Sequence, residues 1–233
     1  MKPRFRSLRA RWHGLLKSRE VTLDGVTLDA REAVVGPQVR AELLRGTYEF
    51  AERRLLRDVL RPGDRVVEIG AGIGAVGLVA ARIVGAENVV SYEANPTLRG
   101  VIEANQARNG LRPELRMRAV TRDGATVRFF VTDLLLSSSI HDRGAAREIE
   151  VESEAIGDVL AEHRPSVLVL DVEGAETDLL PSADLSGLRA IVVETHASVT
   201  GEPAVGAMIA AVERAGFAIT RRAHRNLLLE RRA

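Results

Sequence analysis

A chain of 233 residues is long enough for one domain with a sizeable core, or for one domain with an extension. Its formal net charge of +1 argues against a dedicated nucleic-acid binder, which usually carries a strong basic excess. The sequence lacks cysteine, which excludes disulfides and cysteine nucleophiles, and it has no apolar run long enough to span a bilayer, so we expect a cytoplasmic protein.

The first 45 residues are expected to form an extension ahead of a main domain at residues 46–233. Helically spaced apolar residues among basic ones predict a helix over residues 1–19, whose basic face is either solvated or in contact with an anionic membrane surface or a partner. The apolar stretch at residues 12–16 is too short for a signal-peptide core. Further on, Asp24-Gly25 between two Val-Thr-Leu runs predicts a tight β-hairpin.

From Thr47 onward, short apolar runs alternate with helical stretches. The strands expected in this region are residues 65–69, 88–92, 115–120, 167–170 and 191–194, and the expected helices are residues 48–60, 75–84, 96–109, 155–162, 175–180 and 203–215. Such alternation predicts an α/β, Rossmann-like sheet that is mostly parallel, with helices on both faces. Two further β-pairs depart from it, one over residues 127–131 and 148–152 and one, a terminal antiparallel hairpin, over residues 217–220 and 227–230.

The most informative motif is the glycine-rich turn Gly70-Ala71-Gly72-Ile73-Gly74, which joins a buried strand to a helix. Glycines let the backbone approach a ligand closely, and the helix N-terminus offers free N–H groups. Ligands of open α/β sheets bind at the carboxyl ends of the strands near the point where strand order reverses. The turn therefore predicts a site for an adenosine-containing cofactor.

Two acidic residues near the turn narrow the choice of cofactor. Glu93 ends the next strand, where a carboxylate can accept both hydroxyls of a ribose. Glu68 stands just before the first glycine, where it would repel a pyrophosphate but can accept a hydrogen bond from the ammonium of methionine. These two acidic residues favour S-adenosylmethionine as the cofactor. A dinucleotide stays an alternative, because residues 72–77 also fit the pattern G-x-G-x-x-G. A turn that binds no ligand is the other alternative.

A second group of acids follows the fourth core strand. Asp171, Glu173 and Glu176 lie where this strand gives way to a helix, and Glu194 and His196 follow the next strand. Neighbouring strands would bring Asp171, Glu194 and His196 together beside the glycine turn. We predict these three as catalytic residues, because an imidazole is the natural base for a hydroxyl acceptor near neutral pH and a nearby carboxylate would orient the ring.

Other interpretations of these residues stay open. His196 is equally compatible with a surface or supporting role, and Glu173 and Glu176 with favourable charges in the first turn of a helix. A divalent metal held by Asp171, Glu194 and His196 is chemically possible, but we favour a site without metal at this point.

Several segments together resemble the FkbM-type methyltransferases: residues 68–74, 92–96 and 170–176, the tetrapeptide Gly46-Thr47-Tyr48-Glu49 and the serines at residues 137–139. The likeness covers residues 46–196, although position 68 is Glu where the family frequently has Asp. It implies a seven-stranded sheet and methyl transfer from S-adenosylmethionine, commonly to a hydroxyl of a sugar, glycolipid or polyketide. The likeness also implies that Asp171 lies near the methyl group. It implies a cofactor site that includes Tyr48, Glu49, Glu68, Gly70 and Glu93. The motifs themselves add Ala71, Gly72, Gly74 and Ala94 to this site.

The sequence therefore predicts an S-adenosylmethionine-dependent O-methyltransferase that acts on a hydroxyl of a small molecule or glycan. The competing hypotheses are an NAD(P)-dependent oxidoreductase and a methyltransferase-like module that binds without turnover. We expect no nucleic-acid partner and no integral membrane segment, whereas the acceptor and the oligomeric state stay open.

Overall fold

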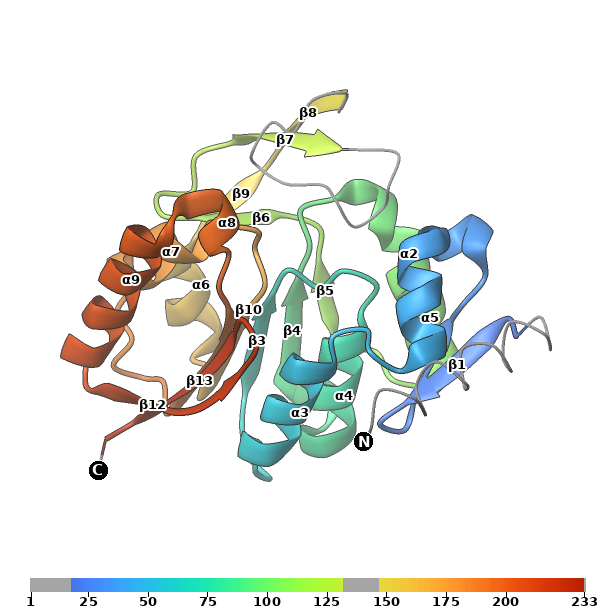
Figure 1. Cartoon of the computed structure of the whole chain (residues 1–233), viewed down its shortest axis with the longest axis horizontal. Helices are drawn as coiled ribbons and strands as arrows, with labels where there is room; N and C mark the ends of the chain where they lie inside the picture. The colour runs from blue at the N-terminus through green and yellow to red at the C-terminus, as the bar shows by residue number, and fades with distance from the viewer. Residues whose placement is uncertain (1–17, 132–146, 233) are drawn as a thin grey trace.

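A seven-stranded sheet forms the centre of the protein in the computed structural model, which describes residues 18–131 and 147–232 (Figure 1). From edge to edge it consists of β12 (Phe217–Ala223), β13 (Asn226–Arg231), β11 (Ala190–Glu194), β10 (Val167–Leu170), β3 (Val66–Ile69), β4 (Val89–Tyr92) and β5 (Glu114–Arg116). The strands β11, β10, β3, β4 and β5 pair in parallel, whereas β13 runs antiparallel to both of its neighbours. The mostly parallel sheet and its terminal hairpin, as predicted, are confirmed.

Helices cover both faces of this sheet. They are α3 (Phe50–Val59), α4 (Ala75–Val84), α5 (Arg99–Asn109), α6 (Ile156–His163), α7 (Glu176–Ser182), α8 (Ala197–Thr200) and α9 (Glu202–Arg214). Two short 3-10 helices, η1 (Ala86–Asn88) and η2 (Pro96–Leu98), lie between them. Alternate strand residues face opposite sides. Leu168 and Leu170 share a hydrophobic cluster with α6, α7 and α9, whereas Val167 and Val169 share one with α3 and α4. Among the described residues, no helix is both long and apolar enough to cross a membrane.

The N-terminal hairpin forms as predicted, with β1 (Glu20–Leu23) paired to β2 (Val26–Asp29) around Asp24 and Gly25. The buried residues of the hairpin lie in one hydrophobic cluster with α5 and the residues of the glycine turn. The division between domains at residue 45 stays a prediction, and this shared core shows that the hairpin packs directly on the main sheet's helices. The helix predicted over residues 1–19 and the serines at residues 137–139 lie outside the described residues, apart from the last two residues of that helix.

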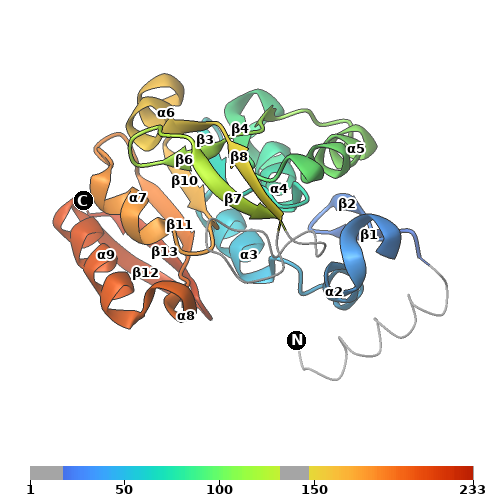
Figure 2. The ribbon, with the colours of Figure 1, turned by 90° about the horizontal axis from the view of Figure 1, so that it is seen from above.

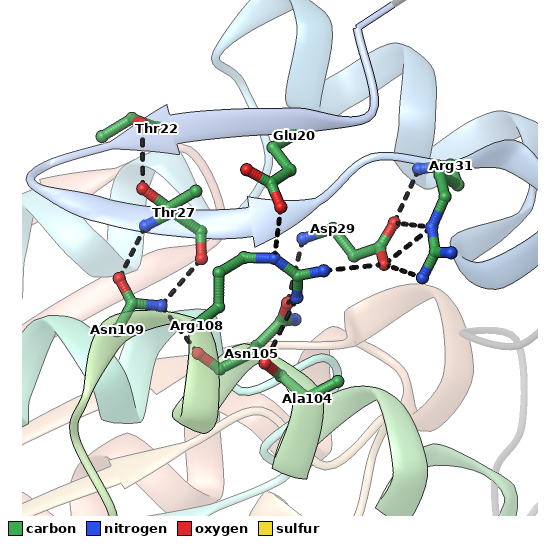
Figure 3. A network of polar contacts seen from close by, with 9 residues as sticks. All are labelled: Glu20, Thr22, Thr27, Asp29, Arg31, Ala104, Asn105, Arg108 and Asn109. Carbon is green, nitrogen blue, oxygen red and sulfur yellow. Dashed lines mark hydrogen bonds and ion pairs between the residues drawn. The ribbon is translucent and has the colours of Figure 1, made fainter.

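A network of charged and amide side chains fastens the hairpin to α5 (Figure 3). We call it the hairpin clasp, and it consists of Glu20, Asp29, Arg31, Asn105 and Arg108. The side chain of Asn105 accepts a hydrogen bond from the backbone N–H of Asp29 at 2.9 Å and donates one to the carbonyl of Ile73 in the glycine turn, also at 2.9 Å. The clasp thus connects the hairpin to the turn through one buried amide.

The order in which the strands are added to the sheet reverses between β3 and β10, which run parallel to each other. From β3 the sheet continues to β4 and β5, and from β10 it continues to β11 on the other side, so the carboxyl ends of β3 and β10 lie side by side. Ile69 and Leu170 are paired in register, which brings the turn after Ile69 next to Asp171. This is where an open α/β sheet binds its ligands.

Four short strands lie above the main sheet in Figure 1 and over its middle in Figure 2: β6 (Ala119–Thr121), β7 (Val127–Val131), β8 (Arg147–Val151) and β9 (Ser153–Ala155). The β7–β8 pair is the predicted inserted pair, and β6 pairs in parallel with β9. The single strand predicted at residues 115–120 is wrong, because β5 ends at Arg116 and β6 leaves the sheet. Val120 there joins the core cluster that contains Ile156 of α6, a distant contact that a local apolar run does not reveal.

The helix α2 (Glu32–Arg45) was not predicted from the sequence. Gly36 and Pro37 interrupt its pattern, and Gly36 has a φ of 76° inside the helix, so that two helical pieces meet at a kink. Burial of Val35, Val39 and Leu43 against the hairpin cluster stabilises both pieces despite these breakers.

Candidate functional site

A cavity of about 670 Å³ opens at the carboxyl ends of β3, β4, β10 and β11. Residues from α2, the start of α3 and β6 complete its wall. Most of the site residues predicted from the sequence line it: Tyr48, Glu49, Gly70, Ala71, Gly72, Glu93, Ala94, Asp171, Glu194 and His196. Glu68 and Gly74 are the two predicted residues that do not line this cavity.

The glycine turn is packed directly against Asp171. Gly70 has a φ of 93°, and a Cβ atom there would lie 1.8 Å from the backbone oxygen of Asp171. The N–H groups of Gly70 and Ala71 donate to the carbonyl of Tyr92 at 2.9 and 3.0 Å. Gly74 forms the N-cap of α4 and packs on Ile102, so its role is to start the helix. The absence of a side chain at position 70 therefore allows two strand ends to meet under the cavity.

Glu68 lies beneath the turn, where its carboxylate accepts hydrogen bonds from the backbone N–H of Gly77 at 2.9 Å and from the hydroxyl of Ser91. Burial raises the pKa of Glu68 to about 8, while the hydrogen bonds from Ser91 and Gly77 act in the opposite direction. Through these two hydrogen bonds, the carboxylate of Glu68 connects β3 to α4 and β4. The predicted contact between Glu68 and a methionine ammonium therefore finds no support in this arrangement.

Glu93 does line the cavity, next to the turn. One of its carboxylate oxygens accepts the N–H of Gly72 at 2.8 Å, and the other accepts the N–H of Asn95 at 2.7 Å. Burial raises the pKa of Glu93 to about 7, against the effect of these backbone hydrogen bonds. Each carboxylate oxygen has a second lone pair, so Glu93 can still accept two hydroxyl groups from a ligand.

Tyr48 and Glu49 come immediately before α3 and line the cavity, and Tyr48 packs in one hydrophobic cluster with Ile73 of the glycine turn. Tyr48 is buried, and this burial raises the pKa of its hydroxyl well above the ordinary value. Glu49 is the N-cap of α3 and has a φ of 44°, a left-handed conformation that is uncommon outside glycine. Such outliers concentrate at functional sites.

His196 is held in one orientation by Glu176. Its Nδ1 lies 3.3 Å from Oε1 of Glu176, which also accepts the backbone N–H of His196 at 2.8 Å. The opposite ring nitrogen, Nε2, lies 3.5 Å from Oδ1 of Asp171 and 3.9 Å from Oε1 of Glu194. Burial opposes protonation of His196, yet the hydrogen bond and the charge of Glu176 raise its pKa. Glu176, which the sequence also allowed as a mere helix charge, is thus the carboxylate that orients the ring.

Four carboxylates converge beside this histidine. We call Glu49, Glu52, Asp171 and Glu194 the carboxylate cluster; one oxygen of each lies within 4.8 Å of the others. Burial, and then the charges of neighbouring carboxylates, raise the pKa of Glu52 and of Asp171 well above their ordinary values. Sequence reasoning missed Glu52; its only local signal is its place one helical turn after Glu49.

Few cations balance the carboxylate cluster. Arg225 pairs with Glu194 at 2.7 Å, but its side chain is 64% exposed. Arg53, next to Glu52 in the chain, turns away to pair with Asp24 and donates to the carbonyl of Tyr48 at 2.9 Å. Within residues 18–131 and 147–232, neither arginine nor lysine pairs with Glu49, Glu52 or Asp171. The cavity therefore has a concentrated negative charge on one wall.

Comparison with known proteins identifies the family. The model of the methyltransferase FkbM domain matches residues 68–219, which is more than half of the chain. The chain belongs to the FkbM methyltransferase family. The match runs from β3 into β12 and so includes the glycine turn, Glu93, Asp171 and His196. Membership of this family, together with the fold, implies the use of S-adenosylmethionine.

Relatives of this FkbM methyltransferase are similar over different lengths. The 31-O-demethyl-FK506 methyltransferase FkbM of Streptomyces tacrolimicus is 28% identical over 209 residues, which cover 73% of this chain and 79% of that protein. The ribosomal protein L11 methyltransferase of Symbiobacterium thermophilum is 34% identical over 64 residues, which cover 28% of this chain and 21% of that protein. A solved structure, the ribosomal protein L11 methylase of Lactobacillus delbrueckii subsp. bulgaricus, matches 79% of this chain and 80% of its own at 17% identity, with a TM-score of 0.45.

Proposed function

We propose that this FkbM-family protein is an S-adenosylmethionine-dependent O-methyltransferase that acts on a hydroxyl group of a small molecule or glycan. The observation that carries the proposal is the pair Glu176–His196, in which a buried carboxylate holds an imidazole with its Nε2 toward Asp171 and the cavity. An imidazole so oriented is suited to remove a proton from a hydroxyl.

The residues present fit S-adenosylmethionine. The turn at Gly70 has no side chain that would fill the cavity floor, and Glu93 retains acceptor capacity for the two ribose hydroxyls. The negative wall formed by Glu49 and Asp171 suits a cofactor that carries an ammonium and a sulfonium. By family resemblance, Tyr48 and Glu49 would belong to the cofactor site. When bound, the cofactor supplies an electrophilic methyl group on a positively charged sulfur.

The chain's own residues then have separate tasks. Nε2 of His196 accepts the proton of the acceptor hydroxyl, while Glu176 keeps the ring in place and stabilises its charged form. The backbone of Asp171 packs against Gly70 at the bottom of the cavity. This contact sets the depth of the cavity, and so how closely the cofactor and the acceptor can approach each other. Most of the rate enhancement is expected from that positioning.

The charge of the cavity also bears on the acceptor. Carboxylates on its wall repel phosphates, so a neutral hydroxyl compound is favoured over a nucleic acid. The relative in Streptomyces tacrolimicus is named for an O-methylation of a small molecule and covers most of this chain, which supports the same acceptor class.

Calorimetry tests the cofactor and a labelled methyl group tests the acceptor atom. We expect S-adenosylhomocysteine to bind and NADPH not to bind, because the carboxylate of Glu93 lies against the N–H of Gly72 in the turn and would repel a pyrophosphate there. Binding of NADPH alone would reverse the assignment in favour of an oxidoreductase. With carbon-13-labelled S-adenosylmethionine and a panel of hydroxyl and amine acceptors, the NMR shift of the product methyl group distinguishes an ether from a methylamine, and a methylamine product would refute O-methylation.

A further inference from the structure

The carboxylate cluster contains more negative charge than its neighbours can balance. Its members come from separate segments: Glu49 and Glu52 from the start of α3, Asp171 from the end of β10 and Glu194 from the end of β11. All four line the same cavity. Like charges brought this close repel one another, so the fold has to hold them together against that repulsion.

The cluster contains buried carboxylate oxygens without a hydrogen-bond partner among the described residues. Glu52 is 2% exposed, its carboxylate reaches the other three, and its Oε1 has no hydrogen-bond partner among the described residues. Oδ1 of Asp171 is likewise buried and makes no hydrogen bond within the described ranges; the nearest cationic group is Nε2 of His196, 3.5 Å away. Buried polar atoms normally have partners, and buried charges are normally paired or bound to a metal.

The cations of the protein that lie close are already committed. Arg53 pairs with Asp24, and His196 is held by Glu176. Arg225 reaches only Glu194 and stays largely in solvent. Within residues 18–131 and 147–232, no arginine or lysine therefore pairs with Glu52 or Asp171, and a bound cation can supply the missing positive partner.

We propose that the carboxylate cluster binds a hard divalent cation, Mg²⁺ or Mn²⁺. All four donors are carboxylate oxygens, the ligand type these ions prefer, and no sulfur or imidazole is among the four that would favour a softer metal. Glu49, Glu52, Asp171 and Glu194 are the ligands. This set differs from the one considered from the sequence, because Glu49 and Glu52 replace His196, which is held by Glu176.

The site goes beyond the proposed methyl transfer and shares Glu49 and Asp171 with the wall assigned to the cofactor. Because its four residues line the cavity, the ion faces the space where an acceptor oxygen would lie. A cation in that place lowers the pKa of a hydroxyl next to it and holds its oxygen in position. We therefore expect acceptors with a metal-binding oxygen to be used in preference to isolated hydroxyls.

Direct binding of Mn²⁺ to the whole chain, followed by electron paramagnetic resonance without cofactor or acceptor, tests the site. We expect one Mn²⁺ per chain, with affinity at least about tenfold weaker in Glu52→Gln and in Glu194→Gln, since loss of a ligand costs no less than loss of a supporting hydrogen bond. Glu42→Gln is the matched control, because Glu42 lines the same cavity outside the cluster and acts on Glu49 only through its charge, so the Mn²⁺ affinity of this variant should fall much less than that of the two ligand variants.

Thermal unfolding provides a second readout. In EDTA, Glu52→Gln should melt at a higher temperature than the wild type, because folding buries the carboxyl of Glu52 among other carboxylates, which disfavours the charge that this group carries in the unfolded chain at neutral pH. Added Mn²⁺ should raise the melting temperature of the wild type and leave that of Glu52→Gln nearly unchanged. Equal stabilisation of both would overturn the proposal, and so would Mn²⁺ affinities that are equal in the wild type and both variants.

Calorimetry with S-adenosylhomocysteine in EDTA separates this proposal from the proposed function. If the wild type binds S-adenosylhomocysteine and does not bind Mn²⁺, the metal site alone is refuted, and weaker binding of S-adenosylhomocysteine to Glu52→Gln would then assign the cluster to the ammonium of the cofactor. If the wild type binds Mn²⁺ and both variants bind it more weakly, the metal site is supported, whether or not S-adenosylhomocysteine binds. Failure of S-adenosylhomocysteine to bind would count against the methyltransferase proposal only.

Discussion

The hairpin clasp and the carboxylate cluster are two groups of charges in one chain, and they are built in opposite ways. In the clasp, the carboxylate of Asp29 accepts hydrogen bonds from the side chains of Arg31 and Arg108 and from the backbone N–H of Arg31. In the cluster, Glu52 and Asp171 face other carboxylates. Burial acts on both groups, but among the described residues arginines offset it at Asp29 and not at Glu52 or Asp171.

The direction of the pKa shifts follows from this difference. Burial alone would raise the pKa of Asp29, but the hydrogen bonds and charge of Arg31, followed by the charge of Arg108, lower it. Burial raises the pKa of Asp171, and the surrounding carboxylates raise it further. Carboxylates that are paired with cations stabilise the fold. Carboxylates without such partners stay together only because the rest of the fold positions them, and perturbed pKa values of this kind cluster at functional sites.

The largest effect should come from the histidine beside the carboxylate cluster. His196→Ala should lower kcat by about 10²- to 10⁴-fold, because it removes the proton acceptor. Affinity for S-adenosylhomocysteine, measured by calorimetry, should change little. Glu176→Gln, which keeps a hydrogen bond to the ring but removes the charge, should lower kcat less. Turnover that survives His196→Ala nearly intact would show that the proton goes elsewhere.

The next effect concerns the residue that connects the clasp to the cofactor turn. Asn105→Ala removes the acceptor for the N–H of Asp29 and the donor to the carbonyl of Ile73, both buried. Leaving two such groups unpaired should cost about 2 to 4 kcal/mol of unfolding free energy, measured with urea. The same variant should bind S-adenosylhomocysteine more weakly, because Ile73 lies within the glycine turn. A variant that is destabilised but binds normally would mean that clasp and turn are independent.

A smaller and pH-dependent effect is expected inside the clasp. Asp29→Asn should lower the unfolding free energy at neutral pH by about 1 to 3 kcal/mol, since it replaces a charged acceptor of Arg31 and Arg108. The folded pKa of Asp29 is lowered, so its stabilisation is fully present above the unfolded pKa of about 4 and is lost as the pH falls through the folded pKa. Urea unfolding at pH 7 and pH 3 should therefore show a difference between wild type and variant that shrinks in acid.

The smallest effect is expected at the rim of the carboxylate cluster. Arg225→Ala removes the arginine that pairs with Glu194, but this side chain is 64% exposed, so the unfolding free energy should change by less than about 0.5 kcal/mol. Affinity for Mn²⁺ should rise slightly, because Glu194 loses a competing cation. A large loss of stability would show that the cluster is balanced after all and would remove its contrast with the clasp.

Sequence alone determined the elements that depend on neighbours in the chain. The short, mostly apolar runs of β3, β4, β10 and β11, the Asp24-Gly25 turn and the glycine turn are local signals, and α4 forms over residues 75–84 as predicted. Parallel strands that alternate with helices then bring Asp171, Glu194 and His196 to one edge of the sheet, so most of the site follows from topology. The segment at residues 115–120 broke this pattern, because its two halves pack on different partners.

Only the tertiary structure decided where each carboxylate points and what it meets. Glu68 has the same charge as Glu93 and stands as close to the glycine turn, yet it lies beneath the turn against Gly77 while Glu93 faces the cavity. Glu52 joins Asp171 from a helix more than a hundred residues earlier in the chain. Contacts between residues so far apart in the chain depend on how helices and strands pack. A local sequence pattern does not determine that packing. The physical difference between a stabilising charge and a ligand-binding one is therefore visible only in the folded chain.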